Sequence, residues 1–144
     1  MNDPAQQTHL DKPAIKFGGT AVYVDDVPAT LNFYKRAFDL ETRFFDAALQ
    51  YGELGTGADV LVSFASHQLG EMLMPGTYVR PANGQPAGVE IAFFVSDLSA
   101  AFAKAVAAGA VPLAQPKTMP WGATVAYLRG PEGTIIGLST RMPA

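Results

Sequence analysis

The chain contains one structural unit twice. Residues 19–38, GTAVYVDDVPATLNFYKRAF, and residues 90–106, EIAFFVSDLSAAFAKAV, both begin with an apolar strand pattern and continue into a helix pattern. Asp26 and Asp97 stand 71 positions apart at the junction of strand and helix, and each follows a Val by two positions. An internal repeat decides the architecture, because each copy folds as one unit and the copies share a core.

Each copy predicts a strand, a helix and three further strands. The strands are expected at residues 17–24, 41–46, 50–54 and 60–65 in the first copy, and at 89–95, 111–116, 124–129 and 134–140 in the second. Asp26 and Asp97 suit the N-caps of the helices, and Gly109 is expected to end the second helix. One helix covers only one face of a four-stranded sheet. We therefore expect an α+β fold, in which two tandem βαβββ modules form a curved mixed sheet around a cleft.

The repeat also predicts the domain organisation. We expect a flexible polar lead at residues 1–16 and a single domain at 17–144. Within it, module one spans about 17–66, a linker 67–87 and module two about 88–141. The linker is rich in Pro and Gly, which predicts a loop with one helical turn around residues 71–74.

Composition excludes several classes of function. The chain has no cysteine, which excludes thiol catalysis, disulfides and Cys-based zinc sites. Its 10 Lys and Arg residues are scattered and its net charge is −3, which argues against a nucleic-acid partner. No apolar run approaches the ~18 residues of a spanning helix, and the amino terminus has no apolar signal core, so we expect a cytoplasmic protein without a membrane partner.

Three segments resemble the vicinal oxygen chelate superfamily, which includes glyoxalase I, bleomycin-resistance proteins and extradiol dioxygenases. They are VYVDDVPATLNFYKRAFDLE, FFVSDLSAAFAKAVAAGA and WGATVAYLRGPEGTIIGL, and the resemblance covers about residues 17–141. It implies the fold expected above, a homodimer and a cleft for a small molecule. It implies no single activity, because this family hosts lyases, isomerases, dioxygenases, transferases and pure binders.

The resemblance also carries over four metal-ligand positions. They fall on Gly19, Glu90, Gly137 and, depending on register, Val62 or Ser63. Only Glu90 is a good ligand, and divalent cations need several converging oxygen or nitrogen donors. We therefore expect no metal site and no cofactor, with a divalent metal as the alternative.

Glu90 is the candidate catalytic residue. It shares one strand face with Ala92 and Phe94, whereas the opposite face is apolar and suits packing under the helix. We expect Glu90 to point into the cleft as a desolvated carboxylate of raised pKa that serves as a base or hydrogen-bond acceptor. The alternative is that it pairs with an Arg or lies at a wet strand end.

Aromatic and polar side chains are the candidate ligand-binding residues. They are Tyr23, Tyr51, Glu53, Phe94 and Trp121. Trp121, in the segment MPWGA, is expected to begin a strand that leads into the cleft. The alternative for these residues is packing in the core, at its rim or between protomers.

Three functions follow. The favoured one is binding of a small aromatic or planar molecule in the cleft without the usual metal, as in bleomycin-resistance proteins. The second is a glyoxalase-like lyase or dioxygenase-like enzyme, with an atypical metal site at Glu90 and His67 or with Glu90 as a metal-free general base. The third is a dimeric interaction module whose cleft is filled.

Overall fold

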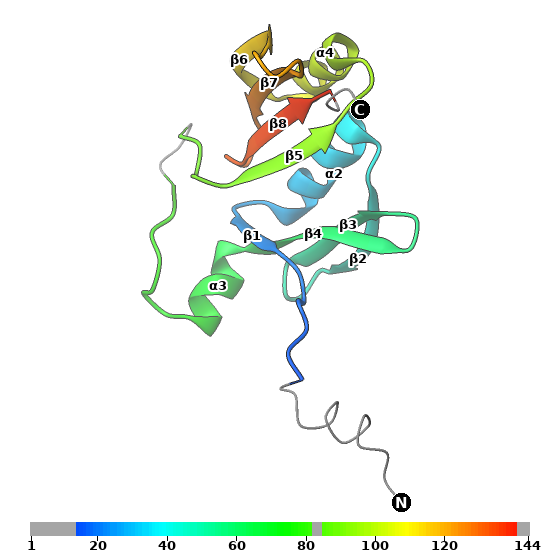
Figure 1. Cartoon of the computed structure of the whole chain (residues 1–144). Helices are drawn as coiled ribbons and strands as arrows, with labels where there is room; N and C mark the ends of the chain where they lie inside the picture. The colour runs from blue at the N-terminus through cyan, green and yellow to red at the C-terminus, as the bar shows by residue number, and fades with distance from the viewer. Residues whose placement is uncertain (1–13, 82–84, 141–144) are drawn as a thin grey trace, which may run out of the picture.

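The computed structural model describes residues 14–81 and 85–140 (Figure 1). The first module contains β1 (Ala21–Val24), α2 (Val27–Phe38), β2 (Glu41–Asp46), β3 (Tyr51–Thr56) and β4 (Asp59–Ser66). After α3 (His67–Leu73), the second contains β5 (Glu90–Phe94), α4 (Leu98–Ala108), β6 (Val111–Thr118), β7 (Thr124–Arg129) and β8 (Ile135–Ser139). All but the last three residues of the expected lead lie outside the described residues.

The two modules form two four-stranded sheets of identical topology. The strand orders are β1-β4-β3-β2 and β5-β8-β7-β6. In each sheet the first and last strands of the module pair in parallel, and the other pairs are antiparallel. The α+β class and the tandem βαβββ modules are thus confirmed.

The same local interaction begins both long helices. Asp26 Oδ1 accepts a hydrogen bond of 3.0 Å from the Ala29 amide, and Asp97 Oδ1 accepts one of 3.0 Å from the Ala100 amide. The second helix ends at Gly109, whose φ of 120° lies in the region that favours glycine. Both acidic residues are therefore helix caps, as the repeat predicted.

Two boundaries differ most from the sequence expectation, and the other strand ends agree with it to within two residues. β1 begins at Ala21, four residues later than predicted, because Gly18 and Gly19 precede it and glycine weakens strands. The start of the linker is helical where a loop was predicted. Ser66 caps α3 by accepting a 3.0 Å hydrogen bond from the Leu69 amide, so His67 begins a helix and does not end a strand.

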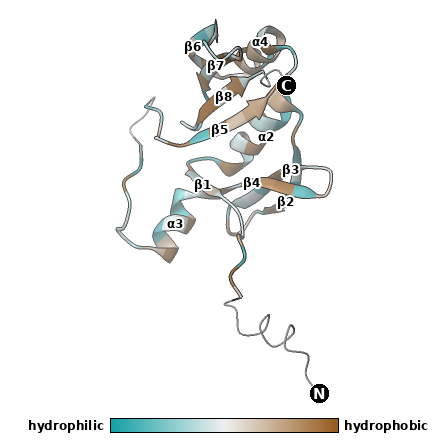
Figure 2. Cartoon of the chain, viewed as in Figure 1, coloured by the Kyte–Doolittle hydropathy of each residue, from teal (hydrophilic) through white to brown (hydrophobic). Residues whose placement is uncertain are grey.

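One hydrophobic core spans both modules. Phe38 of α2 stacks on Phe93 of β5 with ring centroids 4.3 Å apart, and Figure 1 shows α2 between β1 and β5. Figure 2 shows the hydrophobic colouring of β7 and β8, which contribute to this core. The largest fully buried side chains come from both modules: Tyr34, Phe33, Phe64, Leu54, Leu128, Ile136, Leu138, Val24 and Val27.

Polar contacts also join α2 to α4 at the edge of the core. Lys104 of α4 donates to Asp39 Oδ2 at 2.6 Å, beyond the end of α2. Arg36 of α2 donates to the Ala108 carbonyl at 3.2 Å. The faces of both sheets that pack against α2 and α4 are therefore joined. We refer to the opposite face of each sheet, which neither α2 nor α4 covers, as its uncovered face.

A buried carboxyl group joins the β7–β8 turn to α2. The Tyr34 hydroxyl donates a 2.8 Å hydrogen bond to Glu132 Oε1. Glu132 Oε2 is buried without a hydrogen-bond partner among the described residues. Burial raises the pKa of Glu132, and the Tyr34 hydrogen bond only partly opposes that rise.

The raised pKa of Glu132 predicts a loss of stability with rising pH. The folded state favours the protonated carboxyl group, so its contribution is complete below the unfolded pKa of about 4.5 and is lost as pH rises through the folded pKa. We expect Glu132→Gln to match the wild type near pH 4 and to exceed its melting temperature at pH 8. Thermal melts across this range measure the difference. A constant difference between the two proteins at every pH would contradict the prediction.

Candidate functional site

Glu90 lies on the uncovered face of the second sheet. In the register of this sheet, Ala92 stands beside Gly137 and Gly137 beside Tyr127. A Cβ placed at Gly137 would lie 2.9 Å from the Glu90 Cδ and 3.4 Å from the Tyr127 Cε1, and it would also contact Glu90 Oε2. The Glu90 carboxylate therefore occupies the space that a side chain at position 137 needs.

The environment of Glu90 differs from the expectation in one respect. Its side chain reaches the predicted face, but Glu90 is exposed to solvent in the single chain. The predicted desolvation is therefore absent here, because no element within residues 14–81 and 85–140 covers this side of β5. Phe94 shares the face and is 70% exposed.

Three predicted ligand-binding residues share the uncovered face of the first sheet. Tyr23 and Tyr51 both stand beside Ala65, and Glu53 stands beside Ser63. The Tyr51 hydroxyl donates a 3.0 Å hydrogen bond to Ser63 Oγ. Tyr51 also packs against Phe44, with ring centroids 6.3 Å apart.

The predicted residues thus form two groups on different sheets. The first contains Tyr23, Tyr51 and Glu53, and the second contains Glu90 and Phe94. Trp121 lies in the turn between β6 and β7, ahead of the strand that it was expected to begin, and is 55% exposed. No described pocket brings the two groups together.

The strand register shows which of Val62 and Ser63 lies at the metal-ligand position that the family resemblance assigns to β4. Val62 is buried in the hydrophobic core, whereas Ser63 shares the uncovered face with Glu53. Ser63 Oγ is already engaged by Tyr51. Among the residues that the structure describes, no three His, Asp or Glu side chains form a group able to hold a metal ion.

His67 belongs to a polar cluster at the start of α3. Its Nδ1 lies 2.9 Å from the Tyr78 hydroxyl and its Nε2 lies 3.7 Å from Asp25 Oδ1. The Tyr78 ring also packs on Tyr23, with ring centroids 5.3 Å apart. A Cβ at Gly70 would come within 2.5 Å of the Tyr78 hydroxyl, so this glycine leaves room for the contact.

The neutral form of His67 is favoured. Burial is the main cause that lowers the pKa of His67; Arg80 lowers it further and Asp25 partly opposes the shift. His67 does not line a pocket with Glu90, and its contact with Tyr78 holds this linker residue against module one. Tyr78 carries no sequence signal for this role, because the contact depends on how the linker folds back.

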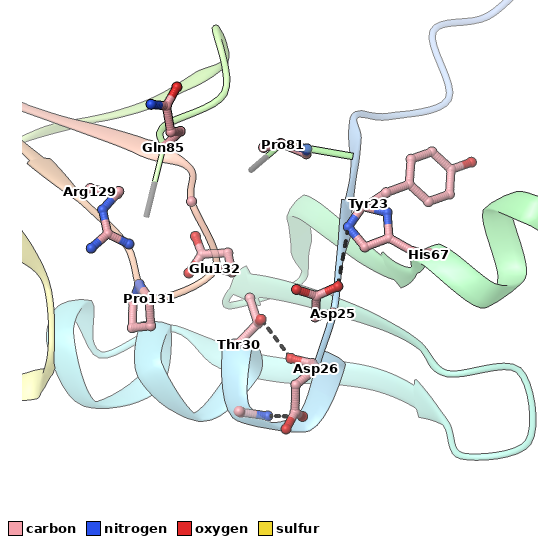
Figure 3. A pocket seen from close by; sticks show the side chains of 12 residues that line it. Tyr23, Asp25, Asp26, Thr30, His67, Pro81, Gln85, Arg129, Pro131 and Glu132 are labelled. Atoms are coloured by element: carbon pink, nitrogen blue, oxygen red, sulfur yellow. Dashed lines mark hydrogen bonds and ion pairs between the residues drawn. The ribbon is translucent and has the colours of Figure 1, made fainter. Parts of the chain in front are cut away.

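A cavity of about 160 Å³ lies between the modules, away from Glu90 (Figure 3). Tyr23, Asp25, Thr30 and His67 line it from module one, and Arg129 and Glu132 line it from module two. Only Tyr23 and His67 were considered from the sequence. The others come from positions far apart in the chain, so no local sequence pattern brings them together.

The family model for the glyoxalase/bleomycin resistance protein/dioxygenase superfamily matches residues 16–138, which include both modules. The chain belongs to this superfamily. A comparison with curated proteins gives no sequence match. The described part of this superfamily member contains no helix long and apolar enough to cross a membrane.

Solved structures show the same fold. A glyoxalase-related enzyme from Fulvimarina pelagi aligns with a TM-score of 0.71 at 17% identity, covering 88% of this chain and 89% of that one. A family enzyme from Burkholderia phytofirmans PsJN gives 0.66 at 18% identity, with 84% and 94% coverage. TioX from Micromonospora sp. ML1 gives 0.60 at 19% identity, with 88% and 100% coverage. At these identities the similarity concerns the fold alone.

The lowered pKa of His67 predicts acid sensitivity. Stability that depends on neutral His67 is present above the unfolded pKa of about 6.5 and is lost as pH falls through the folded pKa. We expect the melting temperature of His67→Gln to change less than that of the wild type between pH 7.5 and pH 5. Thermal melts of the wild type, His67→Gln and Tyr78→Phe at both pH values measure this change in melting temperature. Equal acid sensitivity of wild type and His67→Gln would contradict the assignment.

Proposed function

We propose that this protein binds a small aromatic or planar molecule without a metal ion, on the uncovered face of the second sheet. The observation that carries the proposal is the position of the Glu90 carboxylate over Gly137. In the family's metalloenzymes, the resemblance places ligands at both positions. Here a glycine at 137 makes room for Glu90, so the pair supplies one carboxylate, which is too few donors for a divalent cation.

The residues around Glu90 suit a flat ligand with a polar edge. Phe94 and Tyr127 lie on the same sheet face as Glu90, and aromatic side chains favour stacked or edge-to-face contacts with another ring. An ionised carboxylate accepts hydrogen bonds only. A ligand that carries an N–H or O–H donor beside its ring would satisfy Glu90 and orient the ring against the aromatic side chains.

A second copy of the chain completes the site in this proposal. Each sheet exposes large apolar side chains, with Phe44 50% exposed in the first module and Phe94 70% exposed in the second. Grouped exposed apolar side chains are typical of interaction surfaces. Pairing the uncovered face of one chain's first sheet with that of another chain's second sheet would place Tyr23, Tyr51 and Glu53 opposite Glu90. It would also desolvate the carboxylate.

Ligand binding is expected to depend on the charge of Glu90. A titration with 2-naphthol, followed by isothermal titration calorimetry, should saturate with the wild type. Loss of a hydrogen bond to a charged group costs about 1.5–3 kcal/mol, so Glu90→Gln should weaken binding by about tenfold or more. Glu41→Gln, on exposed β2, is the matched control. Unchanged affinity of Glu90→Gln would contradict the proposed role.

The oligomeric state is a separate prediction. Sedimentation equilibrium should give twice the chain mass of 15.2 kDa for the wild type. Phe44→Asp should yield a monomer, because it places a charge in the proposed apolar interface. Val79→Asp introduces the same charge at a 92% exposed linker position and should leave the dimer intact. A monomeric wild type at micromolar concentration would reject the two-chain site.

A further inference from the structure

The cavity between the modules has walls of opposite charge. Figure 3 shows Asp25 and Arg129 on opposite sides of it, with Glu132 between them. Asp25 follows β1 in module one, and Arg129 is the last residue of β7 in module two. A molecule in this space would therefore contact both modules at once.

The two charged groups at the ends of the cavity are available to a ligand. Arg129 makes no ion pair within residues 14–81 and 85–140, and its guanidinium donates only a 3.4 Å hydrogen bond to the Gly130 carbonyl. The Asp25 side chain is 78% exposed, and its distance of 3.7 Å to His67 Nε2 is too long for a hydrogen bond.

Several other polar side chains of the cavity already form hydrogen bonds within the protein. Thr30 Oγ1 donates to the Asp26 carbonyl at 2.7 Å, and Asp26 itself caps α2. Glu132 Oε1 accepts from Tyr34. Arg129 and Asp25 are thus the two groups of opposite charge that would select a ligand.

The volume of the cavity sets the size of the ligand. Apolar cavities of about 150 Å³ accommodate a benzene molecule, and this cavity measures about 160 Å³. It therefore holds a compact molecule of a similar number of heavy atoms.

We propose that this cavity is a second binding site, which takes a small zwitterion whose carboxylate pairs with Arg129 and whose ammonium group lies against Asp25. A carboxylate and a guanidinium form a charge-assisted, often bidentate pair. A simple anion would bring its charge near Asp25, and a simple cation would face Arg129. Both would meet repulsion that a zwitterion avoids.

This site shares Tyr23 with the proposed aromatic-binding face but is selected by other groups. Glu90 does not line the cavity, and neither Arg129 nor Asp25 is needed for the stacking described above. Because the cavity exists only in the folded chain, ligand binding should also stabilise the fold, by an amount that rises with the logarithm of the ligand concentration above the dissociation constant.

An NMR titration of the ¹⁵N-labelled full chain tests the site. The probes are glycine, 4-aminobutyrate and 6-aminohexanoate, which differ in charge separation, with butyrate and butylamine as single-charge controls. We expect saturable shifts of the amides in residues 23–30 and 129–134 for at least one zwitterion, with an affinity at least tenfold above both controls. The same zwitterion should raise the melting temperature.

Variants separate a specific site from general charge effects. Arg129→Gln and Asp25→Asn should each weaken the binding by at least tenfold, and Asp25→Asn alters a side chain that is 78% exposed. Arg43→Gln, an exposed arginine beside Glu41, and Glu90→Gln should leave the affinity unchanged. Absence of saturable shifts with all three zwitterions, equal binding of either single-charge control, or full affinity in both cavity variants would overturn the proposal.

Discussion

The packing of α2 from the first module against α4 and β5 from the second is the constraint on which the rest of the structure depends. Phe38 stacks on Phe93, and Lys104 and Arg36 close the edge of the helix pair with polar contacts. Because both helices lie in this shared core, each sheet has one face committed to burial and one face that neither α2 nor α4 covers. The arrangement of two similar modules around one core explains why a chain of 144 residues contains the same unit twice. It also leaves aromatic and acidic side chains displayed on both sheets.

Gly137 connects the fold to its proposed chemistry. The backbone of β8 passes directly beneath the Glu90 carboxylate, and any side chain at this position would compete with Glu90 for the same space. A small residue on one strand therefore fixes where the functional group of a neighbouring strand lies. In the proposed function, hydrogen bonding to the single Glu90 carboxylate takes the place of metal coordination. Aromatic neighbours then supply the contact area, and a second chain supplies the exclusion of water that the exposed Glu90 lacks.

The fold could be predicted from the sequence to within a few residues, because its signals are local. Asp26 and Asp97 cap their helices through bonds to residues three positions away, and the alternation around Glu90 identifies the buried face of β5. The site was harder to predict because its contacts join distant segments. Tyr78 reaches His67 only after α3 folds the linker back, and Glu132 reaches Tyr34 across 98 positions of sequence. The separation of Glu90 from Tyr51 follows from how the two sheets pack, which no strand pattern records.

Metal content tests most directly whether Glu90 acts without a metal ion. Elemental analysis would use protein purified without a tag or chelator, before and after incubation with Mn(II), Fe(II), Ni(II) and Zn(II). We expect no stoichiometric metal in any sample, and the same result for wild type and Glu90→Gln, because one carboxylate over a glycine offers too few donors. One metal ion per chain that is lost in Glu90→Gln would contradict this and would make a metal-dependent lyase or dioxygenase the better description.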